Sequence, residues 1–81
     1  MLFRSTTLGA RLREAREARG YGVRELARAV SWPERAVSHA TLSLLESGRQ
    51  EALDAAVAVR LARVLGVSTD WLVAGEGKRA R

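Results

Sequence analysis

The apolar residues of this chain recur at intervals of three and four positions, in short segments that open with a capping residue and mostly close at a glycine. This spacing places side chains on one face of an α-helix. Serine, threonine and aspartate satisfy the free amides of a first turn, and glycine accepts the left-handed conformation that ends a last turn. The pattern predicts an all-α domain of five helices, over residues 8–19, 23–30, 38–49 and 55–65 and in a short segment after Ser68. The expected capping residues are Thr6 or Thr7 for the first helix, Ser38 for the third, Asp54 for the fourth and Ser68 for the last.

The segment 38–49, SHATLSLLESGR, has two chemically different sides. At about 100° per residue, Leu42 and Leu45 share one side, which is suited to burial. Ser38 marks the first turn of this helix and Gly48 marks its end. The opposite side carries Ala40, Ser43, Leu44 and Ser47. One side is therefore predicted to pack on the domain and the other to be displayed.

The 81 residues are expected to form one small domain over residues 6–74, between an N-terminal arm at 1–5 and a flexible basic tail at 75–81. The tail sequence, GEGKRAR, offers nothing to bury. In the first helix, a buried stripe is predicted for Leu8, Leu12 and Ala15. The outer face of that helix is assigned to Arg11, Arg13, Glu14 and Glu17.

Residues 31–37, SWPERAV, connect the second and third helices. Pro33 disfavours helical geometry at the residue before it, although proline can itself begin a short helical turn. Trp32 is interpreted as a lid over the core.

Residue composition excludes several kinds of chemistry. The chain has no cysteine and one histidine, so no disulfide, thiolate nucleophile, zinc finger or other metal site is expected. It has no phosphate-cradling glycine loop and no pattern of paired buried carboxylates, so we expect neither an enzyme nor a cofactor. The first residues are too short an apolar run for a signal peptide, and no stretch approaches the roughly 18 apolar residues of a membrane span. A cytoplasmic protein is therefore expected.

The formal net charge is +5, which suits a polyanionic partner. An arginine-rich composition gives the same excess without any such partner. Lys78, Arg79 and Arg81 stand with Glu76 in the tail, so the tail holds +2 and the rest of the chain about +3. Charge alone therefore leaves both interpretations open.

Four segments resemble the helix-turn-helix proteins of the phage Cro and repressor type, the XRE-like family. They are LGARLREAREARGYG at 8–22, RELARAV at 24–30, TLSLLESGR at 41–49 and LARVLGVSTDWLVAGE at 61–76. The resemblance implies a five-helix, lambda-repressor-like domain that binds double-stranded operator DNA as a homodimer. It implies a bacterial or phage-encoded, nucleoid-associated repressor or autoregulator, and we expect no small-molecule ligand because the chain ends directly after the fifth helix.

The resemblance also implies roles for individual residues. The start of the third helix corresponds to the part that enters the major groove, which assigns base contacts to His39, Ala40, Ser43 and Leu44. Phosphate contacts fall on the backbone near Val23 and on Arg49. A structural ion pair is implied between Arg16, late in the first helix, and Glu46, at the end of the third.

This chain departs from the family pattern in two ways. The turn between the second and third helices is longer than usual, and it could bring Arg35 to the DNA backbone or face a protein partner instead. The exposed side of the third helix also lacks the Arg, Lys, Asn and Gln side chains that read bases in pairs of hydrogen bonds. Specificity is therefore expected to be modest or to depend on DNA shape.

A protein-interaction module is the main alternative, because Leu44 beside Ala40 and the insertion carrying Trp32 could form an apolar docking surface. A membrane-surface role is not expected, since the first helix is too acidic for it.

Overall fold

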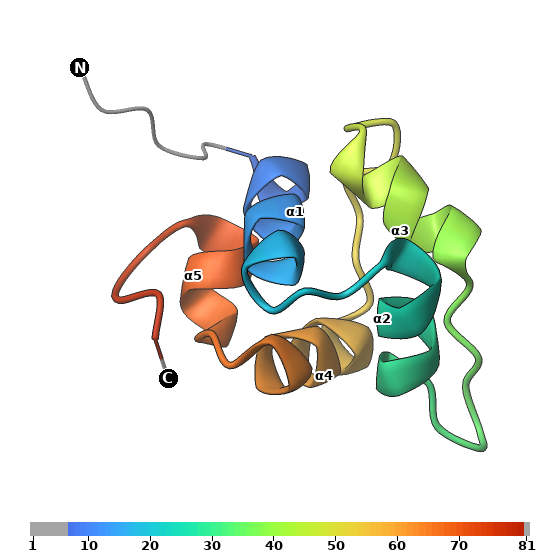
Figure 1. The fold of residues 1–81 in the computed structure, drawn as a ribbon. Helices are drawn as coiled ribbons and strands as arrows, with labels where there is room; N and C mark the ends of the chain where they lie inside the picture. Colours follow the sequence, from blue (N-terminus) through green and yellow to red (C-terminus); the bar gives the residue numbers. More distant parts are fainter. Residues whose placement is uncertain (1–6, 81) are drawn as a thin grey trace.

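The computed structural model describes residues 7–80 of the chain. Five α-helices form this part: α1 (Leu8–Ala18), α2 (Val23–Val30), α3 (His39–Glu46), α4 (Ala55–Leu65) and α5 (Thr69–Ala74) (Figure 1). Its only β-type pairings are two isolated bridges, at the turn after α2 and beside the last residues described. The predicted all-α, five-helix fold is confirmed.

The helices begin at the predicted capping residues. The hydroxyls of Thr7, Ser38 and Ser68 each accept a hydrogen bond from a first-turn amide at 3.1 Å, and the carboxylate of Asp54 accepts from the Ala56 amide at 2.8 Å. α3 ends at Glu46, before the predicted Gly48, whose φ of +80° turns the chain out of the helix. These caps fix the starts of α1, α3, α4 and α5, whereas α2 begins after Gly22, which has no side chain to cap it.

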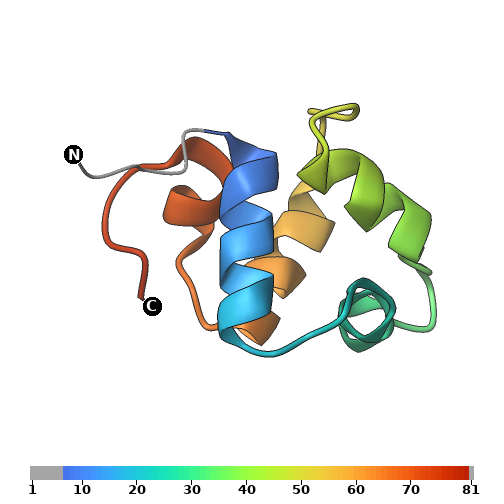
Figure 2. The same cartoon turned by 45° about the horizontal axis from the view of Figure 1, so that its top comes forward.

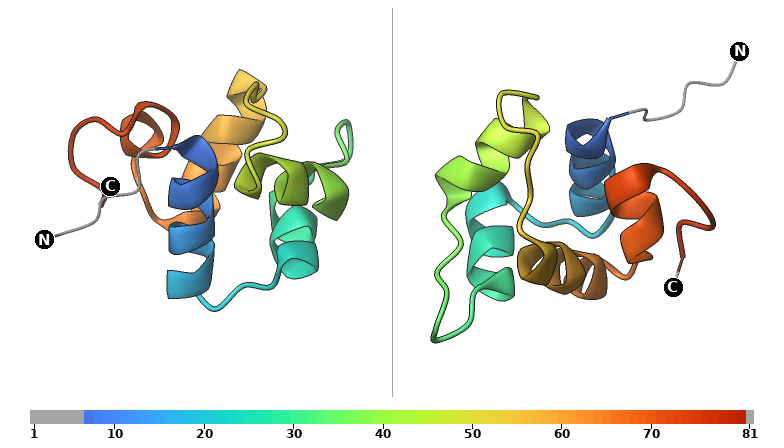
Figure 3. Two further views of the ribbon diagram at one scale, coloured as in Figure 1. Left: turned by 90° about the horizontal axis from the view of Figure 1, so that it is seen from above. Right: turned by 180° about the vertical axis from the view of Figure 1, so that it is seen from behind.

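The helices enclose a single core. α1 packs on α3 and α5, while α2 packs on α3 and α4. α4 closes the core from below in Figure 1, and α3 lies at one edge of the molecule in each view (Figures 1 to 3). The core consists of aliphatic side chains from every helix and from two connections: Leu12, Ala15, Leu26, Ala27, Val30, Val37, Leu42, Leu45, Val57, Leu61, Ala62, Leu65, Val67 and Leu72.

Arg11 is buried, and its assignment to the outer face of the first helix was wrong. The residue is only 5% exposed. Nε donates to the carbonyl of Leu72 at 2.9 Å and Nη2 to the carbonyl of Val73 at 3.0 Å. These carbonyls lie in the last turn of α5, where helix carbonyls lack partners and carry partial negative charge. Arg11 therefore joins α1 to the end of α5.

The last residues described fold back onto the domain although they are exposed. The amide and the hydroxyl of Ser68 donate to the carbonyls of Arg79 and Lys78, each at 2.7 Å. The Arg79 guanidinium pairs with Glu14 at 3.1 Å and lies over the Trp71 ring. The tail was expected to be flexible, but its residues 78–80 make defined contacts with α1, with α5 and with Ser68. The arm predicted at 1–5 lies outside the described residues.

Gly9 permits the close approach of α1 to α3. A Cβ atom at this position would clash with the carbonyl oxygen of Leu45 and would come within 2.9 Å of the carbonyl oxygen of Glu46. Both obstacles are backbone atoms of the last turn of α3, which cannot rotate away. A larger residue at position 9 must therefore push the two helices apart.

Replacing Gly9 by alanine should lower the free energy of unfolding by about 1–3 kcal/mol, the usual cost of overpacking. Urea unfolding followed by circular dichroism measures this. Ala10→Gly is the matched control, because Ala10 is exposed in the same turn and reports the intrinsic preference for alanine over glycine. If Gly9→Ala stabilised the protein by as much as Ala10→Gly destabilised it, the helices could not be as close as described.

Candidate nucleic-acid interface

A bidentate ion pair between Arg16 and Glu46 joins the end of α3 to α1. Arg16 Nε lies 2.7 Å from Glu46 Oε2, and Arg16 Nη2 lies 3.0 Å from Glu46 Oε1. A third donor, Arg16 Nη1, reaches the carbonyl of Tyr21 at 2.8 Å. The two side chains are only 12% and 10% exposed. The hydrogen bond to Glu46 raises the pKa of Arg16, against the opposing effect of burial.

α3 presents one buried and one exposed side. Leu42 and Leu45 are in the core. The four residues predicted to contact bases lie on the opposite side, where His39, Ala40 and Ser43 are exposed and Leu44 is 39% exposed. Neither the His39 imidazole nor the Ser43 hydroxyl makes a hydrogen bond within residues 7–80. This side of α3 is therefore available for contact.

The connection between α2 and α3 contains a tight reverse turn at residues 32–35 and is held together at both ends. The amide of Trp32 donates to the carbonyl of Arg35 at 3.0 Å, and the amide of Arg35 donates back at 2.9 Å. Pro33 thus lies at the tip of a reverse turn and begins no helical turn. The Ser31 hydroxyl accepts from the Val37 amide and donates to the Ala27 carbonyl, both at 2.8 Å. These bonds hold the start of α3 beside the end of α2.

Trp32 packs partly buried against the core, in keeping with its interpretation as a lid. The Arg60 guanidinium lies over its ring, 4.8 Å from the ring centre, and Arg60 Nε donates to the carbonyl of Val30 at 3.0 Å. The Trp32 indole therefore contacts the core and Arg60 of its own domain.

Arg35 is engaged by a carboxylate of its own chain. Its Nη1 atom lies 3.2 Å from Asp54 Oδ2, at a surface position where both side chains are about half exposed. Asp54 also caps α4, and the Val57 amide, the Arg35 guanidinium and the Ala56 amide together lower the pKa of its carboxyl group. A phosphate at Arg35 would therefore have to compete with Asp54.

Val23 and Arg49, the other residues predicted to contact phosphate, lie in different surroundings. Val23 begins α2 and is partly buried against the core. Its preceding residue, Gly22, donates its amide to the Glu25 carboxylate at 2.9 Å. Arg49 follows α3, is exposed, and has no ion-pair partner within residues 7–80. Its guanidinium is therefore available at the end of α3.

The sequence prediction missed two arginines beside α3. Arg24 and Arg28 are exposed on α2 and line a shallow groove of about 290 Å³ that runs between α2 and the start of α3. Ser38 and His39 contribute to the other wall. Their spacing of four residues indicates that both arginines lie on the same side of α2. The sequence pattern does not show that the start of α3 lies next to that side.

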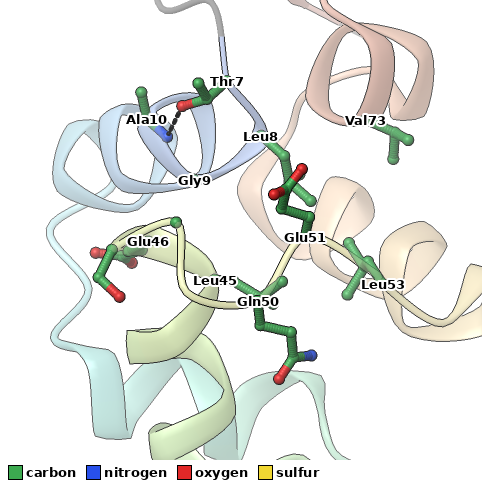
Figure 4. A pocket seen from close by; sticks show the side chains of 12 residues that line it. Thr7, Leu8, Gly9, Ala10, Leu45, Glu46, Gln50, Glu51, Leu53 and Val73 are labelled. Atoms are coloured by element: carbon green, nitrogen blue, oxygen red, sulfur yellow. Dashed lines mark hydrogen bonds between the residues drawn. The ribbon is translucent and has the colours of Figure 1, made fainter.

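A larger hollow lies on the other side of α3, near its end. It has a volume of about 660 Å³ and is bounded by the start of α1, the end of α3, the loop that follows and α5. Leu8, Leu45, Leu53 and Val73 contribute its larger apolar side chains, and Glu51 lies at its edge (Figure 4). Val73 is 43% exposed.

Residues 7–80 contain neither a membrane-spanning helix nor a cluster of metal ligands. None of the helices there has the length and apolar character needed to cross a membrane. No group of three or more His, Asp or Glu side chains in this part of the chain could hold a metal ion.

A family model described as a helix-turn-helix domain matches residues 7–73, which span all of the helices except the end of α5. The chain therefore belongs to the helix-turn-helix domain family, whose usual partner is DNA. Comparisons with curated proteins and with solved structures found no match.

Truncating either member of the Arg16–Glu46 pair should lower the free energy of unfolding by about 3 kcal/mol, because each leaves the other charge nearly buried without its partner. A double-mutant cycle with Arg16→Ala and Glu46→Ala, measured by urea unfolding, should give a coupling energy of about 2 kcal/mol.

The Arg13–Glu17 pair is the matched control, since its side chains are 64% and 58% exposed and both lie on α1. Arg13→Ala should cost less than about 0.5 kcal/mol. Equal costs at Arg13 and Arg16 would mean that the pair to α3 is no stronger than an ordinary surface pair.

Proposed function

We propose that this protein is a sequence-specific transcriptional regulator of the Cro/repressor, XRE-like type. It would bind double-stranded DNA as a homodimer on a two-fold operator and repress transcription, including that of its own gene, by covering a promoter. The proposal rests on how α3 is held: one side is packed on the domain and the other is exposed. Its apolar side and its end are fixed by the core and by Arg16, while His39, Ala40, Ser43 and Leu44 are exposed and their side chains make no hydrogen bond or ion pair within residues 7–80.

The proposed base contacts use the exposed side of α3. His39 can donate or accept one hydrogen bond, Ser43 can pair with several base edges, and Ala40 and Leu44 suit the methyl group of thymine. None of these side chains can make bidentate hydrogen bonds to a base, so each contributes only limited discrimination between bases. Sequence-dependent shape and flexibility of the DNA would then supply part of the specificity.

The proposed phosphate contacts are the backbone near Val23, the guanidinium of Arg49 and, through the turn, Arg35. Arg49 fits this role because it is exposed and unpaired within residues 7–80. Arg35 fits less readily, since its partner Asp54 would have to be released or shared. Phosphate contacts set the register of the protein on the duplex and carry most of the salt-dependent affinity.

Dimerisation is proposed because one small module buries little DNA surface and a two-fold operator suits two copies. The apolar side chains around α5, with Val73 among them, are the proposed contact. The other candidate for the contact, the arm Met1–Leu2–Phe3, lies outside the described residues.

A protein-docking role for α3 is the second candidate, favoured by the exposure of Leu44. In that case the exposed side of α3 would bind a protein surface and the arginines would serve solubility. A random duplex pool separates the two functions: a DNA regulator enriches a motif from the pool, and a docking module enriches none.

Replacing Arg49 by alanine should weaken binding to all sequences of the selected pool by a similar factor. Replacing His39 or Ser43 by alanine should change which sequences are preferred, because base contacts specify and phosphate contacts position. Binding of each variant to several pool members, measured by fluorescence anisotropy, tests the division. If Arg49→Ala changed the preference and His39→Ala did not, the assigned roles would be reversed.

Val73→Glu should convert the dimer to a monomer and weaken binding to a two-half-site operator. Val59→Glu is the matched control, since Val59 is a valine on α4 with nearly the same exposure, 41% against 43%. Light scattering at tens of micromolar, with and without DNA, measures the mass. A wild-type protein that stayed monomeric in both conditions would contradict dimerisation, and loss of the dimer only in Val59→Glu would place the contact elsewhere.

A further inference from the structure

Most arginines in residues 7–80 are committed to partners inside the fold. Some donate to backbone carbonyls, most of them at the ends of helices, and the others pair with carboxylates: Arg11, Arg13, Arg16, Arg19, Arg35, Arg60 and Arg79. The remaining arginines of this part make no hydrogen bond or ion pair with another described side chain: Arg24, Arg28, Arg49 and Arg63. The positive charge available to a ligand is therefore much more localised than the net charge indicates.

Two of these uncommitted arginines share one groove. Arg24 and Arg28 are one turn apart on α2, both exposed, and both line the groove of about 290 Å³ between α2 and the start of α3. The facing wall is formed by Ser38 and His39, and no carboxylate lines the groove. The groove thus has two guanidinium groups and an imidazole but no negative charge of its own.

The long turn at 31–37 shapes this groove. Ser31 and Val37 form part of its lining, and the bond from the Val37 amide to the Ser31 hydroxyl holds the two ends of the turn together. The start of α3 is thereby fixed next to Arg28, and the first-turn amides of α3 add their positive dipole to the same region.

We propose that Arg24 and Arg28, on the α2 wall of this groove, bind a phosphodiester group of the DNA backbone, while His39 on the facing wall keeps its proposed base contact. This inference rests on the proposed function and specifies which cations carry it. Guanidinium groups match phosphate oxygens with paired, charge-assisted hydrogen bonds. With Arg49 beyond the other end of α3, the exposed side of this helix lies between two phosphate contacts. Arg24 and Arg28, rather than the engaged Arg35, are then the main backbone contacts on the α2 side.

The test is the salt dependence of binding to a mixed-sequence duplex by full-length wild-type protein and by Arg24→Gln, Arg28→Gln and Arg63→Gln. Each phosphate contact contributes about 0.9 to the slope of log K against log salt concentration. We expect Arg24→Gln and Arg28→Gln each to reduce the slope by about 1. Arg63→Gln removes the same charge from an equally uncommitted arginine in the last turn of α4 and should leave the slope unchanged.

Lysine variants show whether a loss comes from charge or from misfolding. Arg24→Lys and Arg28→Lys keep the charge and should retain most of the slope while losing affinity, because lysine lacks the paired donors. Slopes of Arg24→Gln and Arg28→Gln equal to that of the wild type or of Arg63→Gln would overturn the proposal. A wild type that bound no duplex at low salt would instead contradict the proposed function itself.

Inorganic phosphate separates a site for the DNA backbone from a site for a free anion. Phosphate is titrated into the protein without DNA at constant ionic strength, and the imidazole resonances of His39 are followed. Weak, non-saturating shifts are expected. Saturation that Arg28→Gln abolishes, together with an unchanged salt slope for DNA, would assign the groove to a free anion and overturn the DNA contact.

Discussion

The ion pair between Arg16 and Glu46 determines where α3 lies. Two parallel hydrogen bonds fix the end of α3 to α1, and the third donor of the same guanidinium holds the turn that leads into α2. Gly9 lets the two helix backbones approach closely enough for this contact. α1, α2 and α3 are thus connected through one side chain, and the direction in which α3 displays its exposed side follows from it.

Arginine is used in this chain as much for construction as for charge. Arg11, Arg19 and Arg60 each donate to carbonyls at or near the end of a helix other than their own, where partial negative charge accumulates. A small domain buries limited apolar surface, so such links between helices add to the contacts of the core. Net charge is consequently a poor guide to the surface on which a polyanion would bind.

Local patterns in the sequence predicted much of this fold. Thr7, Ser38, Asp54 and Ser68 mark the helix starts because capping depends only on neighbouring residues. The periodic spacing of the leucines predicted the core, because this spacing too is a pattern among neighbouring residues. Arg11 was misassigned because it is charged, although its position between Leu8 and Ala15 puts it on the buried stripe.

Contacts between residues that are far apart in the sequence could not be predicted from local patterns. The bond of Arg35 to Asp54 and the return of residues 78–80 to Ser68 depend on how a turn and a tail run through space. The position of Arg24 and Arg28 next to His39 likewise requires knowing where the long turn leaves α3. The placement of Arg16 with Glu46 was expected only from the resemblance to a family, since periodicity within each helix says nothing about pairs between helices.

The exposed side of α3, flanked by arginines, is the surface proposed to meet DNA. The most direct measurement is the change in backbone amide resonances when a duplex is added to isotope-labelled protein at low salt. The largest changes should fall on residues 39–44, on 23–28 and at Arg49, with little change in the second half of α4. Changes confined to α4 and α5, with α3 unaffected while the duplex is bound, would contradict the claim.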